Sequence, residues 1–206
     1  FDVVIGNPPY IRIQTMKRWA PTEVEFYKQA YKAASKGNYD IYVVFVERAL
    51  QLLNEQGRMG YIMPHKFFQA KYGEALRGLI AEGQHLAEIV DFGDEQVFDG
   101  ATTYTCLLFL DKAGNKQFRY RKAEDLEAWR TRGETVEGEV ESRRAKAEEW
   151  NFMVGPGAPL FERLSEMPVR LGNVAHLFVG LQTDADAVYI LEEVERGAEV
   201  VFCRSA

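Results

Sequence analysis

Short apolar runs alternate along the chain with longer segments in which apolar residues recur at helical spacing. Runs bounded by glycine, proline or polar residues are typical of strands, and the helical period predicts helices. We expect buried strands at 1–6, 58–63, 86–92 and 104–110, and helices at 39–56, 71–82 and 160–166, with Gly57 as the C-terminal cap of the first helix. This order predicts an α/β fold. It corresponds to the second half of a Rossmann-like sheet, partly parallel, in which 86–92 and 104–110 form an antiparallel edge.

The pattern changes after about residue 116. Residues 121–150 are dense in Arg, Lys and Glu, which is typical of an exposed helix or linker, and the stretch 155–159 is a Gly-Pro breaker. Beyond it, 171–181 and 188–191 have the pattern of strands. We therefore expect a half-domain at 1–120, a charged linker or helix at 121–159, and the truncated start of a second domain at 160–206. Because the sequence opens directly on a strand, we expect it to be a fragment of a larger protein.

Composition limits the class of protein. Of the 206 residues, 47% are apolar and 13% aromatic, which is enough for a packed core. No apolar run is long enough to span a membrane and no signal peptide is recognisable, so the cytoplasm is the expected compartment. The separated Cys106 and Cys203, and three histidines without ligand spacing, predict no disulfide framework and no metal site.

Charge is distributed unevenly. The net charge of −6 argues against general electrostatic binding to nucleic acid. The segment 12–36, however, carries six Lys or Arg against two Glu, interleaved with aromatic residues. Basic and aromatic side chains together suit phosphate contact and base stacking, although a solvated helix face with aromatic anchors has the same composition.

The tetrapeptide Asn7-Pro8-Pro9-Tyr10 follows the first expected strand. Two consecutive prolines end the strand and leave a stiff loop, which holds Asn7 and Tyr10 in one geometry. The Asn7 side-chain oxygen and the Pro8 carbonyl can accept hydrogen bonds from an amino group, and Tyr10 offers a face for stacking a flat ring. The loop therefore predicts capture of a planar ligand that carries an amino group.

With this tetrapeptide, the chain resembles the second half of the TaqI-type adenine-specific DNA methyltransferases, a class also fused into bifunctional restriction–modification enzymes. The segments that carry the resemblance are 7–10, 39–45, 60–64 with 67–68, 97–109, and 171–183, the last being similar to the start of a target-recognition domain. The resemblance implies methyl transfer from S-adenosylmethionine to the amino group of a flipped-out adenine in double-stranded DNA. It assigns 1–120 to a catalytic half-domain and 160–206 to a truncated recognition domain.

The resemblance also implies roles for individual residues. Asn7, Pro8, Pro9 and Tyr10 would form the catalytic loop, with Phe109, or Tyr104 instead, as a second aromatic against the adenine. Phe45 would line the pocket for the cofactor's adenine. Candidates for DNA contact are Arg12, Lys17, Arg18, His65 and Lys66, the last two on a loop after a strand and suited to phosphate.

One departure from the family concerns the methyl donor. The glycine-rich loop and the acidic residue that cradle the donor precede the catalytic loop in this class, and no residues here can supply them. We therefore expect the main donor pocket on a missing N-terminal half, and the isolated chain to bind S-adenosylmethionine weakly and to be inactive.

Two other classes of function remain open from the sequence. The same tetrapeptide and fold serve amino methyltransferases acting on protein glutamine, and an RNA adenine methyltransferase is also compatible. The second of these classes is a non-catalytic DNA-binding or specificity fragment that requires a partner.

Overall fold

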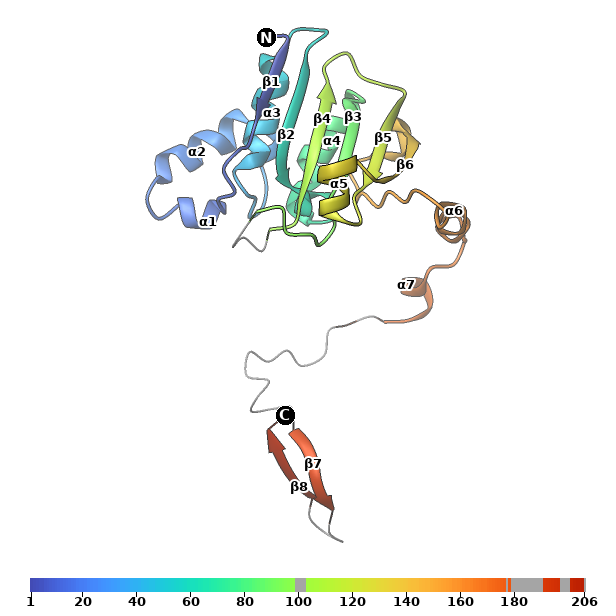
Figure 1. Cartoon of the computed structure of the whole chain (residues 1–206). Coiled ribbons are helices and arrows are strands. Elements are labelled where there is room, and N and C mark those ends of the chain that lie inside the picture. The colour runs from blue at the N-terminus through green and yellow to red at the C-terminus, as the bar shows by residue number, and fades with distance from the viewer. Residues whose placement is uncertain (99–102, 177, 179–190, 197–200, 206) are drawn as a thin grey trace. The chain divides into compact units, whose positions relative to one another are not determined.

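Six strands form one mixed sheet in the order β1-β2-β4-β3-β5-β6 (Figure 1). The strands are β1 (Val3–Gly6), β2 (Arg58–Pro64), β3 (Leu86–Asp91), β4 (Thr105–Asp111), β5 (Gln117–Lys122) and β6 (Val136–Glu141). The α-helices that precede, connect or follow these strands are α1 (Ile13–Met16), α2 (Pro21–Ala30), α3 (Tyr42–Leu52), α4 (Glu74–Glu82), α5 (Leu126–Arg132) and α6 (Ala158–Ser165). The computed structural model describes residues 1–98, 103–176, 178, 191–196 and 201–205. They fall into two compact units, Phe1–Glu162 and Arg163–Ala206.

The sheet confirms the predicted α/β class and its mixed strand directions. β1 runs parallel to β2, and β3 parallel to β5, whereas β4 is antiparallel to both of its neighbours. The antiparallel pairing of β3 with β4 was expected, but the pair does not form the edge, because β4 lies inside the sheet between β2 and β3. The antiparallel edge strand is β6, which pairs with β5.

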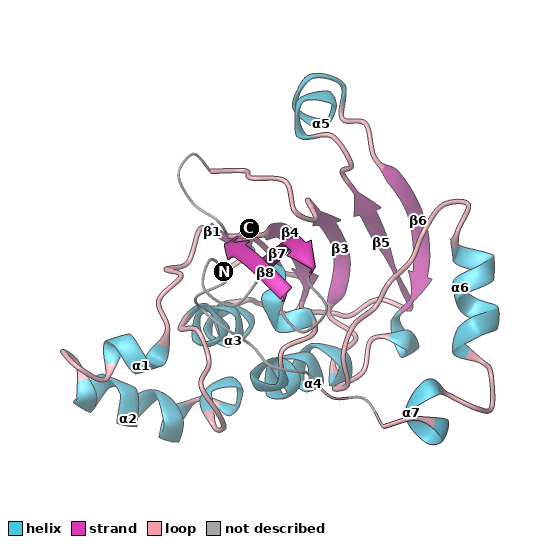
Figure 2. Ribbon diagram, turned by 90° about the horizontal axis from the view of Figure 1, so that it is seen from below, coloured by secondary structure: helices cyan, strands magenta, loops and turns pink. Residues whose placement is uncertain are grey.

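Helices cover both faces of the sheet. Figure 2 shows α3 and α4 on one face and α5 on the other. The main core includes buried residues of α3 and α4 together with Met59, Met63, Leu108 and Leu110, since alternate residues of a strand point to the same face. A smaller core forms under α5 from Val90, Phe92, Ala123 and Leu126.

Three local expectations are corrected by the structure. The strand at the N-terminus is not buried, since the side chains of Val3 and Ile5 are 65% and 83% exposed on a strand that pairs on one side only. The helix before Gly57 ends earlier, with Leu53 as its C-cap. Gly57 instead lies in the turn to β2, where an added Cβ would meet the Phe1 carbonyl oxygen at 2.8 Å.

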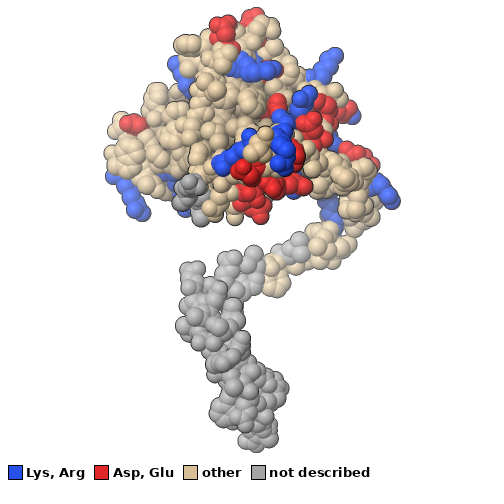
Figure 3. Space-filling view, in the orientation of Figure 1, with Lys and Arg blue, Asp and Glu red and all other residues tan. Residues whose placement is uncertain are grey.

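Residues 121–150 are not a helical linker. They contain the end of β5, helix α5 and strand β6, and Trp150 is buried in the main core. The charged residues mislead because β6 is an edge strand that carries glutamates on its exposed positions. Acidic and basic side chains gather over α5 and the neighbouring part of the sheet, while the surface over β1 and β2 is largely uncharged (Figure 3).

The second unit contains a short helix, α7 (Leu171–Val174), and an antiparallel hairpin of β7 (Leu191–Arg196) and β8 (Val201–Ser205). The strand expected from residue 171 is wrong over its first four residues, which are helical. Of the other residues expected in strands, 177, 179–181 and 188–190 lie outside the described part, and whether this unit begins a recognition domain stays a prediction. Among the described residues no helix is long and apolar enough to cross a membrane.

Candidate functional site

The tetrapeptide 7–10 lies at the carboxyl end of β1. Asn7 and Pro9 are exposed, Pro8 is buried, and Tyr10 is half-buried against the main core. The Tyr10 hydroxyl donates a hydrogen bond to the Ile62 carbonyl oxygen at 3.1 Å. Burial raises the pKa of Tyr10 to about 12, with a smaller contribution from Cys106, so the ring stays neutral. The loop is thus held to β2 at one end while Asn7 remains open to solvent.

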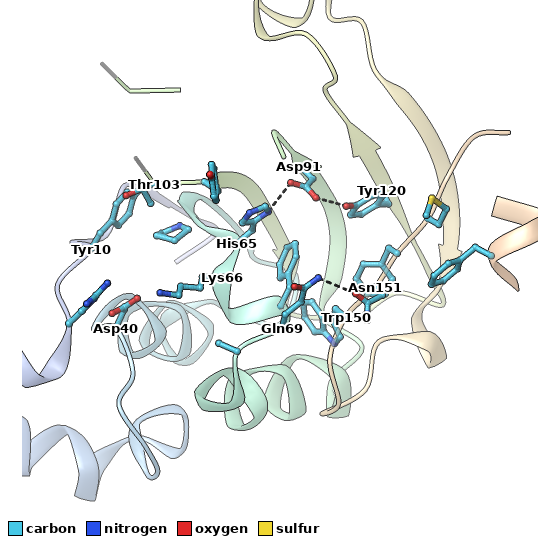
Figure 4. A pocket seen from close by; sticks show the side chains of 18 residues that line it. Tyr10, Asp40, His65, Lys66, Gln69, Asp91, Thr103, Tyr120, Trp150 and Asn151 are labelled. Atoms are coloured by element: carbon cyan, nitrogen blue, oxygen red, sulfur yellow. Dashed lines mark hydrogen bonds and ion pairs between the residues drawn. The ribbon is translucent and has the colours of Figure 1, made fainter. Parts of the chain in front are cut away.

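A cavity of about 830 Å³ lies beside this loop, at the carboxyl ends of β2 and β3. Figure 4 shows its lining, to which Tyr10 contributes from the loop after β1, His65 and Lys66 from the segment after β2, and Asp91 from the end of β3. This is the edge at which α/β sheets commonly bind ligands. Of the residues predicted from the sequence, the structure gathers Tyr10, Arg12, His65, Lys66 and Tyr104 around one cavity.

Asp91 is the centre of a hydrogen-bonded row across the back of the cavity (Figure 4). Its Oδ1 lies 2.9 Å from His65 Nδ1 and accepts from the Gly93 amide, and its Oδ2 accepts from the Tyr120 hydroxyl at 2.5 Å. Burial pushes the Asp91 pKa upward, but hydrogen bonds from His65, Tyr120 and Gly93 outweigh burial and lower the pKa below its ordinary value. Burial and the neighbouring Asp91 raise the pKa of Tyr120, which therefore stays protonated. The row joins three strand ends that are distant in sequence.

A second group of polar residues lies on the opposite side of the cavity. Asp40 accepts a hydrogen bond from the Tyr72 hydroxyl at 3.3 Å, and the hydroxyls of Tyr72 and Tyr42 lie 2.7 Å apart. The backbone of Arg12 forms an isolated antiparallel bridge with Asp40. This bridge connects the basic segment after the loop at 7–10 to the residues just before α3.

The third wall comes from the segment after β6. The Trp150 amide donates to the Phe68 carbonyl oxygen at 2.8 Å, and Gln69 Nε2 donates to Asn151 Oδ1 at 3.1 Å. The Trp150 ring packs on Phe68 with ring centroids 5.5 Å apart, and Phe152 and Met153 also line the cavity. The sequence did not predict this part of the lining, because residues 121–159 were expected to be a charged linker or helix. Trp150 and Phe152 were a signal of burial, since they are aromatic residues within a charged stretch.

Arg77 on α4 connects the segment after β2 with the segment after β6, both of which line the cavity. Its guanidinium is buried and donates to the carbonyl oxygens of Phe67 at 2.6 Å, Ala70 at 2.9 Å and Ala147 at 2.8 Å. Burial lowers the pKa of Arg77, and its Nε and Nη1 donate to three backbone carbonyl oxygens rather than to a carboxylate. The segment after β2 and the segment after β6 therefore form one braced structure.

Several other predicted residues lie outside the cavity lining. Asn7, Pro8 and Pro9 precede Tyr10 on the loop without lining the cavity, and Lys17 and Arg18 are exposed after α1. Phe45 is 39% exposed on α3. Phe109 packs with the small core under α5, where its ring lies over Gly60, so Tyr104 is the aromatic residue of this region that reaches the cavity.

Asp40, Asp91, Tyr120 and Asn151 are site residues that the sequence did not single out. A signal existed for Asp91, which ends a strand where ligand-binding residues of α/β sheets are found. Tyr120 and Asn151 had no such signal, since their segments were not assigned to the sheet.

Comparison with known proteins identifies a family for part of the chain. Residues 1–98 match the family described as Eco57I restriction-modification methylase. Over these residues the chain belongs to that family. It is 34% identical over 200 residues to the type II restriction enzyme and methyltransferase RM.Eco57I of Escherichia coli, covering 95% of this chain and 20% of that protein. It is 28% identical over 211 residues to the type II methyltransferase M.XhoI of Xanthomonas vasicola, covering 92% of this chain and 37% of that protein. The chain thus spans only a minor part of these relatives.

The fold has a counterpart among solved structures. The type IIL restriction-modification enzyme MmeI, determined in complex with DNA, superposes with a TM-score of 0.50 at 15% identity, over 67% of this chain and 18% of that one. At this identity the likeness concerns the fold alone.

Proposed function

We propose that this chain supplies the acceptor side of a DNA methyltransferase that transfers a methyl group from S-adenosylmethionine to the exocyclic amino group of a flipped-out adenine. In this proposal it acts in the cytoplasm as part of a restriction–modification system. The observation that carries the proposal is the Asn-Pro-Pro-Tyr loop at the end of β1, with Tyr10 held to Ile62 and turned into the large cavity. Membership of the Eco57I family supports it.

The loop suits the chemistry of an aromatic amino group, which is a poor nucleophile because its lone pair is delocalised into the ring. The Asn7 side-chain oxygen and the Pro8 carbonyl accept the two amino hydrogens, which localises the lone pair and orients it toward the incoming methyl. Asn7 is exposed and so available for this contact, while buried Pro8 fixes the loop. The Tyr10 ring stacks on the flipped base, and Tyr104 is the second aromatic in reach of the cavity.

The methyl donor fits this chain poorly. Phe45 is the residue expected to contact the donor's adenine, and it is a surface residue of α3 outside the lining of the cavity. The donor, S-adenosylmethionine, supplies the electrophilic methyl. We infer that it is held mainly by a donor-binding half outside this chain, and we assign no step to residues of this chain that would contact it.

The uncovered part of β1 supports such a partner segment. Phe1, Val3 and Ile5 are 72%, 65% and 83% exposed on a strand with one free edge, and the surface over β1 and β2 is largely uncharged (Figure 3). An apolar strand edge of this kind is the type that pairs with a further strand. The proposed partner is the N-terminal half of the methyltransferase domain, and this chain covers only 20% of RM.Eco57I.

Double-stranded DNA is the proposed substrate. Arg12 and Lys66 line the cavity and provide positive charge for phosphates, and exposed Lys17 and Arg18 extend the basic surface along α1. Residues 160–206 are proposed as the start of a target-recognition domain.

The test uses this chain joined to a donor-binding half. We expect methylation of adenine in duplex DNA, and a loss of about a hundredfold or more in kcat for Asn7→Ala, because an oriented acceptor at the reacting atom contributes that much. Asn38→Ala is the matched control, since Asn38 is also exposed and belongs to the segment before α3 rather than to the loop at 7–10. Full activity of Asn7→Ala would refute the proposal. Methylation of a glutamine peptide or of RNA in preference to DNA would redirect it to the other amino methyltransferases.

A further inference from the structure

The His65 ring is held from several sides at the back of the cavity. Its Nδ1 faces Asp91 at 2.9 Å, and its backbone amide donates to the Tyr104 carbonyl oxygen at 3.2 Å. The rings of Phe68 and Tyr104 flank it, with centroids 5.8 and 6.2 Å away. Among the described residues, nothing forms a hydrogen bond with the other ring nitrogen, Nε2, although His65 lines the cavity.

The hydrogen-bonded row determines which ring nitrogen carries the proton. Asp91 is ionised, because its pKa is lowered, and its two oxygens already accept from the Gly93 amide and the Tyr120 hydroxyl. A carboxylate can only accept, so Nδ1 must be the donor. In the neutral ring Nε2 then carries a lone pair and no hydrogen.

We propose that His65 is a substrate-contacting residue whose Nε2 accepts a hydrogen bond from an N–H group on a nucleobase edge, and that Asp91 and Tyr120 are positioning residues that hold the required tautomer. This deepens the proposed function and rests on it, since it takes DNA as the ligand. It replaces the expectation that His65 contacts phosphate, because a phosphate oxygen needs a donor and the neutral Nε2 is an acceptor. Nucleobase edges present N–H donors beside an aromatic face, which suits a cavity lined by Tyr10, Tyr104 and Phe68.

Other charged and titratable groups surround His65 in the cavity. They are Lys66 on its own segment, Asp91 at the end of β3, Tyr120 on β5 and Tyr104 before β4, with Arg12 and Asp40 across the cavity. Tyr120 stays protonated and Asp91 stays ionised, so both keep the hydrogen bonds that orient the His65 ring.

The first experiment reads the tautomer directly. In a histidine-selective ¹H–¹⁵N correlation spectrum of the chain above pH 8, we expect the His65 proton on Nδ1. Tyr120→Phe, which removes only one hydroxyl, is expected to raise the fraction of the other tautomer. A proton on Nε2 in the unaltered chain would overturn the proposal.

The second experiment measures binding of a short single-stranded deoxyoligonucleotide containing all four bases. We expect about tenfold weaker binding for His65→Leu, the value of one lost hydrogen bond, and partial recovery for His65→Gln, whose amide oxygen can still accept. Recovery of binding by His65→Lys but not by His65→Gln would identify a phosphate contact, which needs a donor, and would overturn the proposal.

The outcomes separate this inference from the function on which it rests. Binding that is unchanged in His65→Leu would reject the role of His65 and leave the DNA methyltransferase proposal intact. Absence of oligonucleotide binding, together with absence of adenine methylation by the chain joined to a donor-binding half, would reject both.

Discussion

The Tyr10 hydroxyl donates a hydrogen bond to the Ile62 carbonyl oxygen at 3.1 Å, across 52 residues of sequence. Tyr10 belongs to the loop that follows β1, and Ile62 belongs to β2, the parallel neighbour of β1. One contact therefore ties the candidate catalytic loop to the strand from which His65 and Lys66 emerge. The position of Tyr10 relative to His65 and Lys66 is therefore fixed by strand β2, to which both parts of the cavity lining are attached.

Substitution at Tyr10 separates the hydrogen bond from the ring. Tyr10→Phe removes the bond to Ile62 and is expected to lower the free energy of unfolding by about 1 kcal/mol, with methylation reduced only a few-fold. Tyr10→Ala also removes the stacking face, which is worth about 1–3 kcal/mol per base, so kcat/KM for DNA is expected to fall tenfold to a hundredfold. Denaturant unfolding and steady-state methylation measure the two effects. Equal activity of the two variants would exclude a stacking role.

Arg77 is predicted to be a structural brace of the cavity. Arg77→Met leaves the carbonyl oxygens of Phe67, Ala70 and Ala147 without their donor, and we expect a loss of about 3 kcal/mol in the free energy of unfolding. Arg48→Met on α3 is the control, since Arg48 is exposed, and it is expected to change stability by less than about 0.5 kcal/mol. Urea unfolding followed by circular dichroism compares them. Similar stability of the two variants would show that the brace is dispensable.

Two glycines are predicted to respond in opposite directions to the same substitution. A Cβ on Gly73 would lie 2.1 Å from the Phe67 carbonyl oxygen, so Gly73→Ala must displace backbone and is expected to cost about 2–4 kcal/mol. A Cβ on Gly78 would meet only the Ala147 side chain at 3.6 Å, within helix α4. Gly78→Ala is therefore expected to stabilise by about 0.5–1 kcal/mol. Thermal unfolding of the pair gives the signs, and a stabilising Gly73→Ala would contradict the tight approach.

Stability is predicted to depend on pH through Asp91. Its pKa in the folded protein lies below the ordinary value of 3.8, because hydrogen bonds from His65, Tyr120 and Gly93 outweigh the upward effect of burial. The stabilisation is present above the unfolded-state pKa and is lost as the pH falls through the lower, folded-state pKa. The difference in unfolding free energy between the unaltered chain and Asp91→Asn should be largest near pH 6 and shrink below about pH 4. A difference that grows toward acid would reverse the assignment.

The residues that could be recognised from sequence are those whose chemistry is local. The prolines after β1 end that strand whatever surrounds them, so Asn7 and Tyr10 were identified as a loop pair from the tetrapeptide alone. The four strands expected within residues 1–110 and the helix at α4 were likewise readable, because apolar spacing is a property of neighbouring residues. The same inference from neighbouring residues was wrong for 121–150, because the exposed glutamates of edge strand β6 give that segment the composition of a linker.

Sequence by itself determined the class of the fold, the loop at 7–10 and the family to which its motifs are similar, since each depends on residues within a few positions of one another. Tertiary structure alone decided that β4 is inserted between β2 and β3, that Phe109 packs under α5 while Tyr104 reaches the cavity, and that Asp91 joins His65 to Tyr120. Strand pairing sets these relationships, because it brings together the ends of strands that lie about 30 residues apart. No local pattern encodes which of those ends become neighbours.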